Sequence, residues 1–403
     1  MEAVLSVDLE DAPSFPVPRT VPYQPPESYR QISSRGPLNK VTLWDKRRVW
    51  LVTGYAQGRR LLSDPKLSAD RTRQEYPTMA PHLGAQAARK LVLVGEDPPI
   101  HDIHRRLLNP EFSLKKARAL APRIQELVDG LIDDMLAAGP TADLVQSYAL
   151  PIPSLVMSEL VGVPYEDHKF FQAATAGVMQ AREPAETEAA GAQLAQYLGT
   201  LVERNLTEPG DGVIGRLVHY VQAGTITAAE LTQLSMVLMI AGLETTSSMI
   251  PLGVVTLFAH PEQLAAFISG EVPVQTAVEE LLRYLAVTDF AAVRWVTDDI
   301  EIDDVVIRAG DGIVVSSTMV NRDESVHADP HVFDISRGNR QHLTFGYGIH
   351  QCLGQNLARL QLETAYRTLF ARIPGLRLAV PFEDLRMRSS GTMQGLESLP
   401  VTW

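Results

Sequence analysis

The sequence FGYGIHQCLG, residues 345–354, surrounds the one cysteine of this 403-residue chain. Its glycines, which stand on both sides of Cys352, allow positive φ angles and close approach of the backbone to a flat ligand. Leucines then recur at helical spacing, which predicts a helix from near Cys352 to Arg372. Because the amino end of a helix stabilises an anion, the stretch favours a metal-binding thiolate. The alternative is a buried cysteine in a glycine-rich turn.

The composition is that of a globular protein in a reducing compartment. Hydrophobic residues make up 45% and charged residues 21%, and one cysteine allows no intramolecular disulfide. The formal net charge of −12 disfavours nucleic acids and anionic membranes as partners. Residues 1–26 are rich in proline and lack a basic region followed by an apolar run, so no secretory signal is expected. The apolar stretch 236–243 is too short to span a bilayer, and we predict a cytoplasmic protein.

Hydrophobic periodicity predicts two prominent helices. One runs from about Leu120 to Gly139. The other covers residues 228–259, begins with a capping box formed by Thr227 and Glu230, and would be about 45 Å long at ~1.5 Å per residue. It is apolar on nearly all sides, so it should be buried, and Pro251 should kink it or weaken its last turns.

The remaining pattern adds small β elements to a mainly helical chain. Residues 1–30 are expected to be extended coil, and residues 41–53 to form a hairpin around Asp45–Arg48. A second β-rich stretch is predicted over 292–317, with turns at 303–304 and 309–312. No repeat or linker interrupts the pattern, so residues 1–403 are interpreted as one large domain.

Residues 345–354 resemble the haem-binding signature of the cytochromes P-450. The phenylalanine, glycines, basic residue and cysteine of that signature correspond here to Phe345, Gly346, Gly348, His350, Cys352 and Gly354. The resemblance implies a triangular helical prism with a β-rich subdomain, in which Cys352 is the axial ligand of a haem b iron. Segments 66–71, 139–154 and 398–403 extend it over nearly the whole chain, towards the actinobacterial family 105.

Other motifs resemble the family's structural pair and its oxygen-activation site. Glu280 and Arg283 match a Glu-x-x-Arg pair that is structural in the family, with Arg337 as its third partner. In the run AGLETT, residues 241–246, Glu244 and Thr245 match the acid and alcohol that deliver protons. The alternative is that Thr245 bonds back to its own helix and Glu244 forms a salt bridge. Gly242 is expected to let the helix open locally for oxygen.

The resemblance also implies haem- and substrate-binding residues. The residues expected to contact haem, including its two propionates, are His101, Arg105, Ala241, Gly242, Arg294, Thr344, Phe345, Gly346, His350, Cys352 and Gly354. The pocket is expected to be lined from segments 77–90, 171–182, 234–241, 287–293 and 393–394. The apolar residues predicted to contact substrate are Val237, Leu238, Val287, Phe290, Ala291 and Met393. The glycine- and alanine-rich run around Gly84 suggests a mobile lid.

The implied activity is hydroxylation of an unactivated C–H bond in a bulky lipophilic molecule. Oxygen is the co-substrate, and electrons are expected from a ferredoxin and its reductase, with the enzyme a monomer. Basic residues flanking the cysteine loop should steer an acidic ferredoxin. They are Arg105, Arg106, Lys115, Lys116, Arg118, Arg340, His342, His350 and Arg359.

Three other functions remain open from the sequence. The first is a nitric oxide reductase of the same haem-thiolate type, which would take electrons directly from a nicotinamide. The second is a non-catalytic haem-binding homologue, which retention of Glu244, Thr245 and Cys352 disfavours. The third is a helical binding module without haem.

Overall fold

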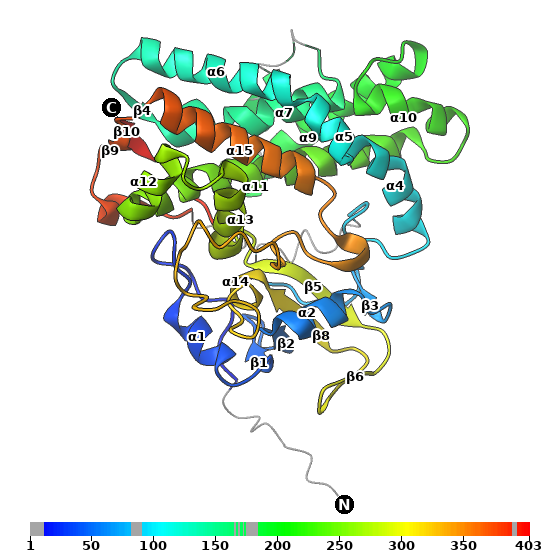
Figure 1. Ribbon diagram of the computed structural model, residues 1–403. Helices are drawn as coiled ribbons and strands as arrows, with labels where there is room; N and C mark the ends of the chain where they lie inside the picture. Colours follow the sequence, from blue (N-terminus) through cyan, green and yellow to red (C-terminus); the bar gives the residue numbers. More distant parts are fainter. Residues whose placement is uncertain are drawn as a thin grey trace, which may run out of the picture.

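The computed structural model of the protein describes residues 12–81, 91–164, 184–388 and 393–403, with the single positions 167, 170, 171, 173 and 174. Helices form one half of the molecule, and a small β-sheet with short flanking helices forms the other (Figure 1). The mainly helical architecture expected from the sequence is confirmed.

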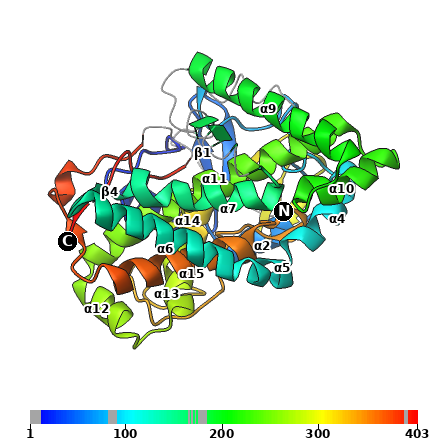
Figure 2. The same cartoon turned by 90° about the horizontal axis from the view of Figure 1, so that it is seen from above.

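Helix α11 (Ala228–Ala259) runs through the centre of the helical half. It contacts α7, α9, α10, α13 and α15, and Figure 2 shows α7 and α15 beside it when the molecule is seen from above. The helices of this half are α4 (Ile100–Leu108), α5 (Leu114–Ala119), α6 (Ala121–Ala138), α7 (Pro151–Val161), α9 (Pro184–Thr207), α10 (Val213–Gln222), α12 (Pro261–Ser269), α13 (Val274–Leu285) and α15 (Gln355–Arg372).

The capping box predicted for α11 is present. The Glu230 N–H donates to Thr227 Oγ1 at 3.1 Å, and the Thr227 N–H donates to Glu230 Oε2 at 2.7 Å. By length and composition α11 could cross a membrane, but 67% of its most apolar 18-residue window is buried inside the protein, as in a core helix. The helix continues through Pro251 to Ala259, and the kink or weakening of its last turns at Pro251 stays a prediction. Tyr366 of α15 supports this region by donating its hydroxyl to Met249 O at 2.5 Å.

The main sheet has the strand order β1-β2-β8-β5-β3. Strands β2 and β8 are parallel and the other neighbours are antiparallel, with a β-bulge between Phe290 and Ala292 on β5. The strands of the molecule are β1 (Leu38–Thr42), β2 (Arg48–Val52), β3 (Leu67–Ser68), β4 (Thr141–Asp143), β5 (Phe290–Val296), β6 (Ile300–Ile302), β7 (Val305–Ile307), β8 (Gly312–Ser316), β9 (Arg377–Leu378) and β10 (Pro400–Thr402). Helices α1 (Glu27–Ser33), α2 (Tyr55–Leu62) and α14 (Ser317–Val320) belong to this half (Figure 1).

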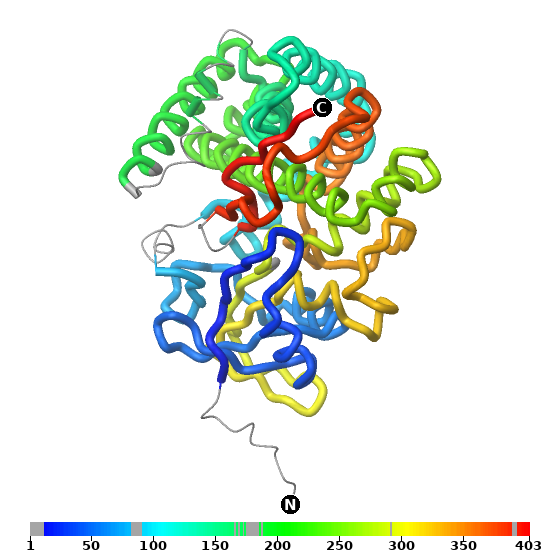
Figure 3. The backbone as a smooth tube through the Cα atoms, turned by 90° about the vertical axis from the view of Figure 1, so that its left-hand side faces the viewer, coloured from blue at the N-terminus to red at the C-terminus, as the bar shows by residue number. Residues whose placement is uncertain are grey.

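The carboxyl-terminal segment joins the two halves. Figure 3 shows it passing from the junction of the halves back to the helical half, where β10 pairs with β4 and β9. An isolated bridge between Thr288 and Met393 holds this segment next to the start of β5. Residues from two distant parts of the chain therefore meet at the junction.

Most predicted boundaries are confirmed, and one is wrong. The hairpin forms as β1 and β2, and α6 ends where Gly139 adopts a φ of 131°. The first thirty residues are not all coil, because α1 begins at Glu27 and buries Tyr29 and Ile32 on one face. The last long helix runs from Gln355 to Arg372, which confirms the helix predicted to begin near Cys352. The Cys352 N–H is bound to Phe345 O and closes the loop just before this helix starts.

Candidate active site

The loop that carries Cys352 is shaped by its glycines. Gly346 and Gly348 have φ angles of 67° and 74°, and a Cβ on Gly348 would collide with Leu62 O. Only glycine allows both the left-handed backbone and the approach to α2 at that point. The Cys352 N–H donates to Phe345 O at 2.8 Å, which fixes the side chain at the end of the loop.

The Cys352 thiol opens into an internal cavity. Its side chain is exposed there, yet burial raises the thiol pKa, while the Gly354 N–H and the cations Arg105 and Arg359 act to lower it. The thiol is exposed to the cavity but shielded from the outer surface. A thiol in this position stays protonated unless a bound metal ion supplies further positive charge.

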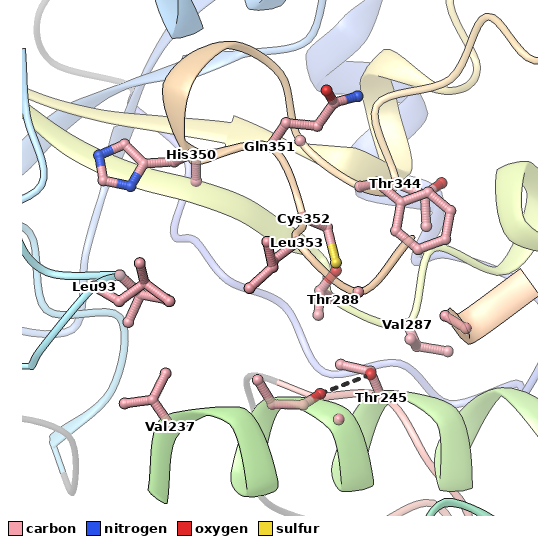
Figure 4. Close-up of a pocket in the computed structure, with 18 of the residues that line it drawn as sticks. Leu93, Val237, Thr245, Val287, Thr288, Thr344, His350, Gln351, Cys352 and Leu353 are labelled. Carbon is pink, nitrogen blue, oxygen red and sulfur yellow. Dashed lines mark hydrogen bonds between the residues drawn. The ribbon is translucent and has the colours of Figure 1, made fainter. Parts of the chain in front are cut away.

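The cavity lies between the cysteine loop and α11 and has a volume of about 560 Å³. Figure 4 shows the Cys352 sulfur pointing across it towards the turn of α11 that carries Thr245. The walls are mainly apolar, with Val237, Leu238 and Val287 among them. A volume of roughly 300–1,000 Å³ is usual for cofactor and small-molecule sites.

One end of the cavity is strongly basic. Arg71, His101, Arg105, Arg294 and His350 line it, and the described lining residues include no aspartate or glutamate. The rings of His101 and His350 lie 4.2 Å apart, and both Nε2 atoms are buried without a hydrogen-bond partner. Burial lowers the pKa of His101 and of Arg294, and it lowers that of His350 to about 2.

This set of polar groups fits an anionic flat cofactor. Arg105 donates to Gln351 O at 3.0 Å and Arg294 to Val293 O at 2.8 Å, so two guanidinium groups with backbone partners stand beside two imidazole Nε2 atoms without partners. Buried polar atoms without hydrogen-bond partners cost free energy unless a ligand satisfies them. Two carboxylates at this end and a metal ion above Cys352 would satisfy the whole set.

The acid and alcohol of α11 face different directions. Thr245 lines the cavity, and its hydroxyl donates to Ala241 O at 3.0 Å (Figure 4). This is the back-bonding that the sequence left open as an alternative, and it leaves the oxygen lone pairs free to accept from the cavity. Glu244 is not among the residues that line the cavity. Burial raises its pKa, and the charge of Arg388 acts in the opposite direction.

Glu280, Arg283 and Arg337 come together in the core below the cysteine loop. Arg283 donates to Glu280 at 2.7 Å through both Nε and Nη2, and Arg337 Nε lies 3.4 Å from the same carboxylate. Arg283 also donates to the carbonyl of Asn321, whose side chain binds the Leu343 N–H and the Thr344 hydroxyl. The trio is therefore linked by hydrogen bonds to the residues that precede the cysteine loop.

The structure brings most of the predicted site residues to one cavity. Beyond the residues already placed, it is lined by Gly242, Phe290, Thr344, Phe345, Gly346, Gly354 and Met393. Ala291 lies at the β-bulge of β5. A Cβ on Gly242 would lie 2.7 Å from Met157 Sδ, so this glycine permits close packing of α11 against α7. Residues 82–90, which include the suggested lid, and most of 171–182 lie outside the described residues.

Sequence reasoning missed Arg71 and Met157, which also line the cavity. Arg71 was noted only as part of a segment that resembles family 105, and its Nε is buried without a hydrogen-bond partner. Met157 has the spacing of an ordinary core residue, so nothing in the sequence distinguishes it.

The predicted basic face is partly wrong. Arg106 on α4 and Lys115, Lys116 and Arg118 on α5 are exposed, and α5 contacts α15. His342 is buried against Glu279 at 3.0 Å, and Arg359 is held by the same carboxylate at 2.6 Å. His350 faces the cavity. His342 and Arg359 face inward because the buried Glu279 carboxylate accepts their hydrogen bonds.

Comparisons with known proteins agree with this geometry. A family model described as cytochrome P450 matches residues 273–373. The vitamin D3 dihydroxylase of Streptomyces griseolus is 48% identical over 98% of this chain and 97% of its own. Pentalenic acid synthase of Streptomyces avermitilis is 47% identical over 97% of each chain. The crystal structure of cytochrome P450 MoxA from Nonomuraea recticatena, a CYP105 protein, superimposes with a TM-score of 0.92 at 43% identity and covers 97% of this chain and 98% of that one.

Proposed function

Because this chain belongs to the cytochrome P450 family and is an oxygen-incorporating oxidoreductase, we propose that it hydroxylates an unactivated C–H bond of a bulky lipophilic small molecule with electrons from a ferredoxin. The observation that carries the proposal is the Cys352 sulfur facing Thr245 across a mainly apolar cavity (Figure 4). The cavity has a basic end, and its described lining residues include no aspartate or glutamate. Residues 1–403 would act as one monomeric, cytoplasmic unit, and the crystallised relatives support a soluble protein.

Haem b would be held by contacts from three segments of the chain. Cys352 would provide the sulfur ligand of the iron, and His101, Arg105, Arg294 and His350 would receive the two propionates. When bound, haem supplies the activation of molecular oxygen, which no side chain can perform. Glu280, Arg283 and Arg337 would act structurally, through Asn321, on the residues that lead to the cysteine loop.

The remaining residues would handle protons and orient substrate. The Thr245 hydroxyl, held by Ala241 O, presents its lone pairs to the cavity and can accept a hydrogen bond from water or substrate there. Glu244, on the neighbouring position of α11, would act as the acid that renews protons from the opposite side of the helix. Val237, Leu238, Val287, Phe290, Ala291 and Met393 would form the substrate-contacting wall.

The apolar walls and the relatives support the proposed substrate class. The names of the two curated relatives refer to vitamin D3 and pentalenic acid, which are lipophilic molecules with few polar groups. An apolar wall around a single reactive position suits such a molecule, since binding would come from burial of its surface.

The proposal is tested by product analysis with labelled oxygen. Purified protein, a ferredoxin, its reductase and a panel of lipophilic compounds are incubated under ¹⁸O₂, and one labelled hydroxyl oxygen in the product is the expected result. Consumption of NADH with nitric oxide in the absence of ferredoxin, without labelled product from the panel, would favour the reductase instead.

A further inference from the structure

Glu244 lies on a face of α11 that points away from the cavity. Ser248 is one turn further along, so the two side chains share a face. Neither residue lines the cavity, whereas Thr245 does. The surroundings that control the Glu244 proton must therefore be sought on the far side of the helix.

Arg388 of the carboxyl-terminal segment occupies that side. Its Nη2 donates to Ser248 Oγ in a short hydrogen bond, and its backbone N–H donates to Gly395 O at 2.8 Å. A Cβ on Gly395 would lie 2.6 Å from Arg388 Nε and 2.8 Å from Cζ, so a side chain there would displace the guanidinium. The segment thus holds a cation against α11 in a notch that only glycine leaves open.

The guanidinium is only partly engaged. Its Nε is buried and has no hydrogen-bond partner, although Nη2 is bound to Ser248. Burial lowers the pKa of Arg388 and raises that of Glu244, and each charge favours the ionised form of the other. Among the described residues, no other charged group contributes to either shift. The two groups form no ion pair within 4.0 Å, so Arg388 acts on Glu244 through its charge and not through direct contact.

We propose that Arg388 is a positioning residue for the Glu244 carboxylate. Ser248 and the Gly395 notch hold its guanidinium beside α11, so that Glu244 can ionise and be reprotonated on the side opposite the cavity. The inference rests on the proposed function, because an oxygen-activating enzyme needs a renewable proton donor at this helix. Because Nε has no partner, the guanidinium has a second donor that can reach towards Glu244 while Nη2 stays bound to Ser248.

The charge of Arg388 has a measurable consequence for Glu244. Without it, burial alone acts on the carboxyl group, which then holds its proton to higher pH. Since the two groups are close but not in contact, we expect Arg388→Gln to raise the midpoint of Glu244 titration by about one pH unit. Arg388→Lys keeps the charge, so the midpoint of Glu244 titration in this variant should lie within about 0.3 pH units of the wild-type midpoint.

The experiment is an infrared titration of the purified ferric protein. The carboxylic-acid C=O band of Glu244 is assigned by its loss in Glu244→Gln, and its midpoint is compared in wild type, Arg388→Gln and Arg388→Lys. Arg386→Gln is the matched control, because it removes the same charge two residues away at an exposed position. A wild-type midpoint in Arg388→Gln, or an equal shift in Arg386→Gln, overturns the proposal.

Ser248→Ala separates the tether from the charge, because it keeps both ionisable groups. It should shift the Glu244 midpoint upward by less than Arg388→Gln does, and an unchanged midpoint contradicts the tether. If Arg388→Gln fails to fold, Ser248→Ala and Arg388→Lys show whether Arg388 positions the Glu244 carboxylate or only packs against α11.

Turnover distinguishes a failure of this inference from a failure of the proposed function. Ferredoxin-driven product formation should fall several-fold in Arg388→Gln, while hydrogen peroxide-driven product formation is retained because peroxide carries its own protons. Wild type that forms no product by either route would refute the proposed function. Active wild type with identical product yields in Arg388→Gln by both routes would refute only the role of Arg388.

Discussion

Glu280→Gln tests whether the buried pair holds the region below the cysteine loop. The substitution keeps the shape of the side chain but removes its charge, which leaves Arg283 and Arg337 without their carboxylate. The side chains of Arg283 and Glu280 are 0% and 1% exposed, so water cannot replace the lost partner. Removing one partner of a buried ion pair costs about 3–5 kcal/mol. Carbonyl bonds from Arg283 to Asn321 and Pro330 remain, so we expect the lower part of that range.

The matched control is Glu126→Gln. Arg123 and Glu126 have the same spacing of three residues and lie 3.1 Å apart, but their side chains are 39% and 67% exposed. An exposed pair contributes at most about 1 kcal/mol. The free energy of unfolding in urea is measured for both variants and for wild type. If Glu280→Gln lowers the free energy of unfolding by no more than Glu126→Gln does, the reasoning is refuted, because burial then does not strengthen the ion pair.

Three further predictions concern packing, pH and partner docking. Gly242→Ala should lower the free energy of unfolding by about 1–3 kcal/mol through its clash with Met157, and Met157→Ala should recover part of it, as measured in urea. Burial opposes ionisation of Glu279, but hydrogen bonds from His342 and Arg359 outweigh it and lower its pKa to about 2. Its stabilising effect is therefore complete above the ordinary value of 4.5 and lost as the pH falls towards 2, so Glu279→Gln should flatten the stability–pH curve in that window; an unchanged slope contradicts the assignment. Lys115→Glu with Arg118→Glu should reduce ferredoxin-driven turnover and its salt dependence, whereas Arg308→Glu on the β half should not; equal effects would exclude α5 as the docking surface.

Most of the fold and of the candidate site could be predicted from residues 345–354 and from the long apolar helix. Strong local signals made this possible: the glycines around Cys352 and the Thr227–Glu230 capping box have local physical causes, and both act as the sequence predicts. The helix α1 was missed because its signal is weak, with prolines before it and only two buried residues within it.

The sequence could not show in which direction individual side chains point. Periodicity places Glu244 and Thr245 on the same helix, but it does not say that only Thr245 lines the cavity. The same holds for Arg359 and His342, whose positive character suggested an outer surface although both bind Glu279 in the interior. Arg388 carried no sequence signal, because its significance depends on Ser248, 140 positions away, and on the space left by Gly395.

The central claim is that Cys352 binds haem iron as a thiolate. The most direct measurement is the absorption spectrum of the reduced protein with carbon monoxide, for wild type and for Cys352→Ala. We predict a strongly red-shifted Soret band in wild type that is absent from the variant. A band at the position of histidine-ligated haem in wild type, or a colourless protein, would contradict the claim.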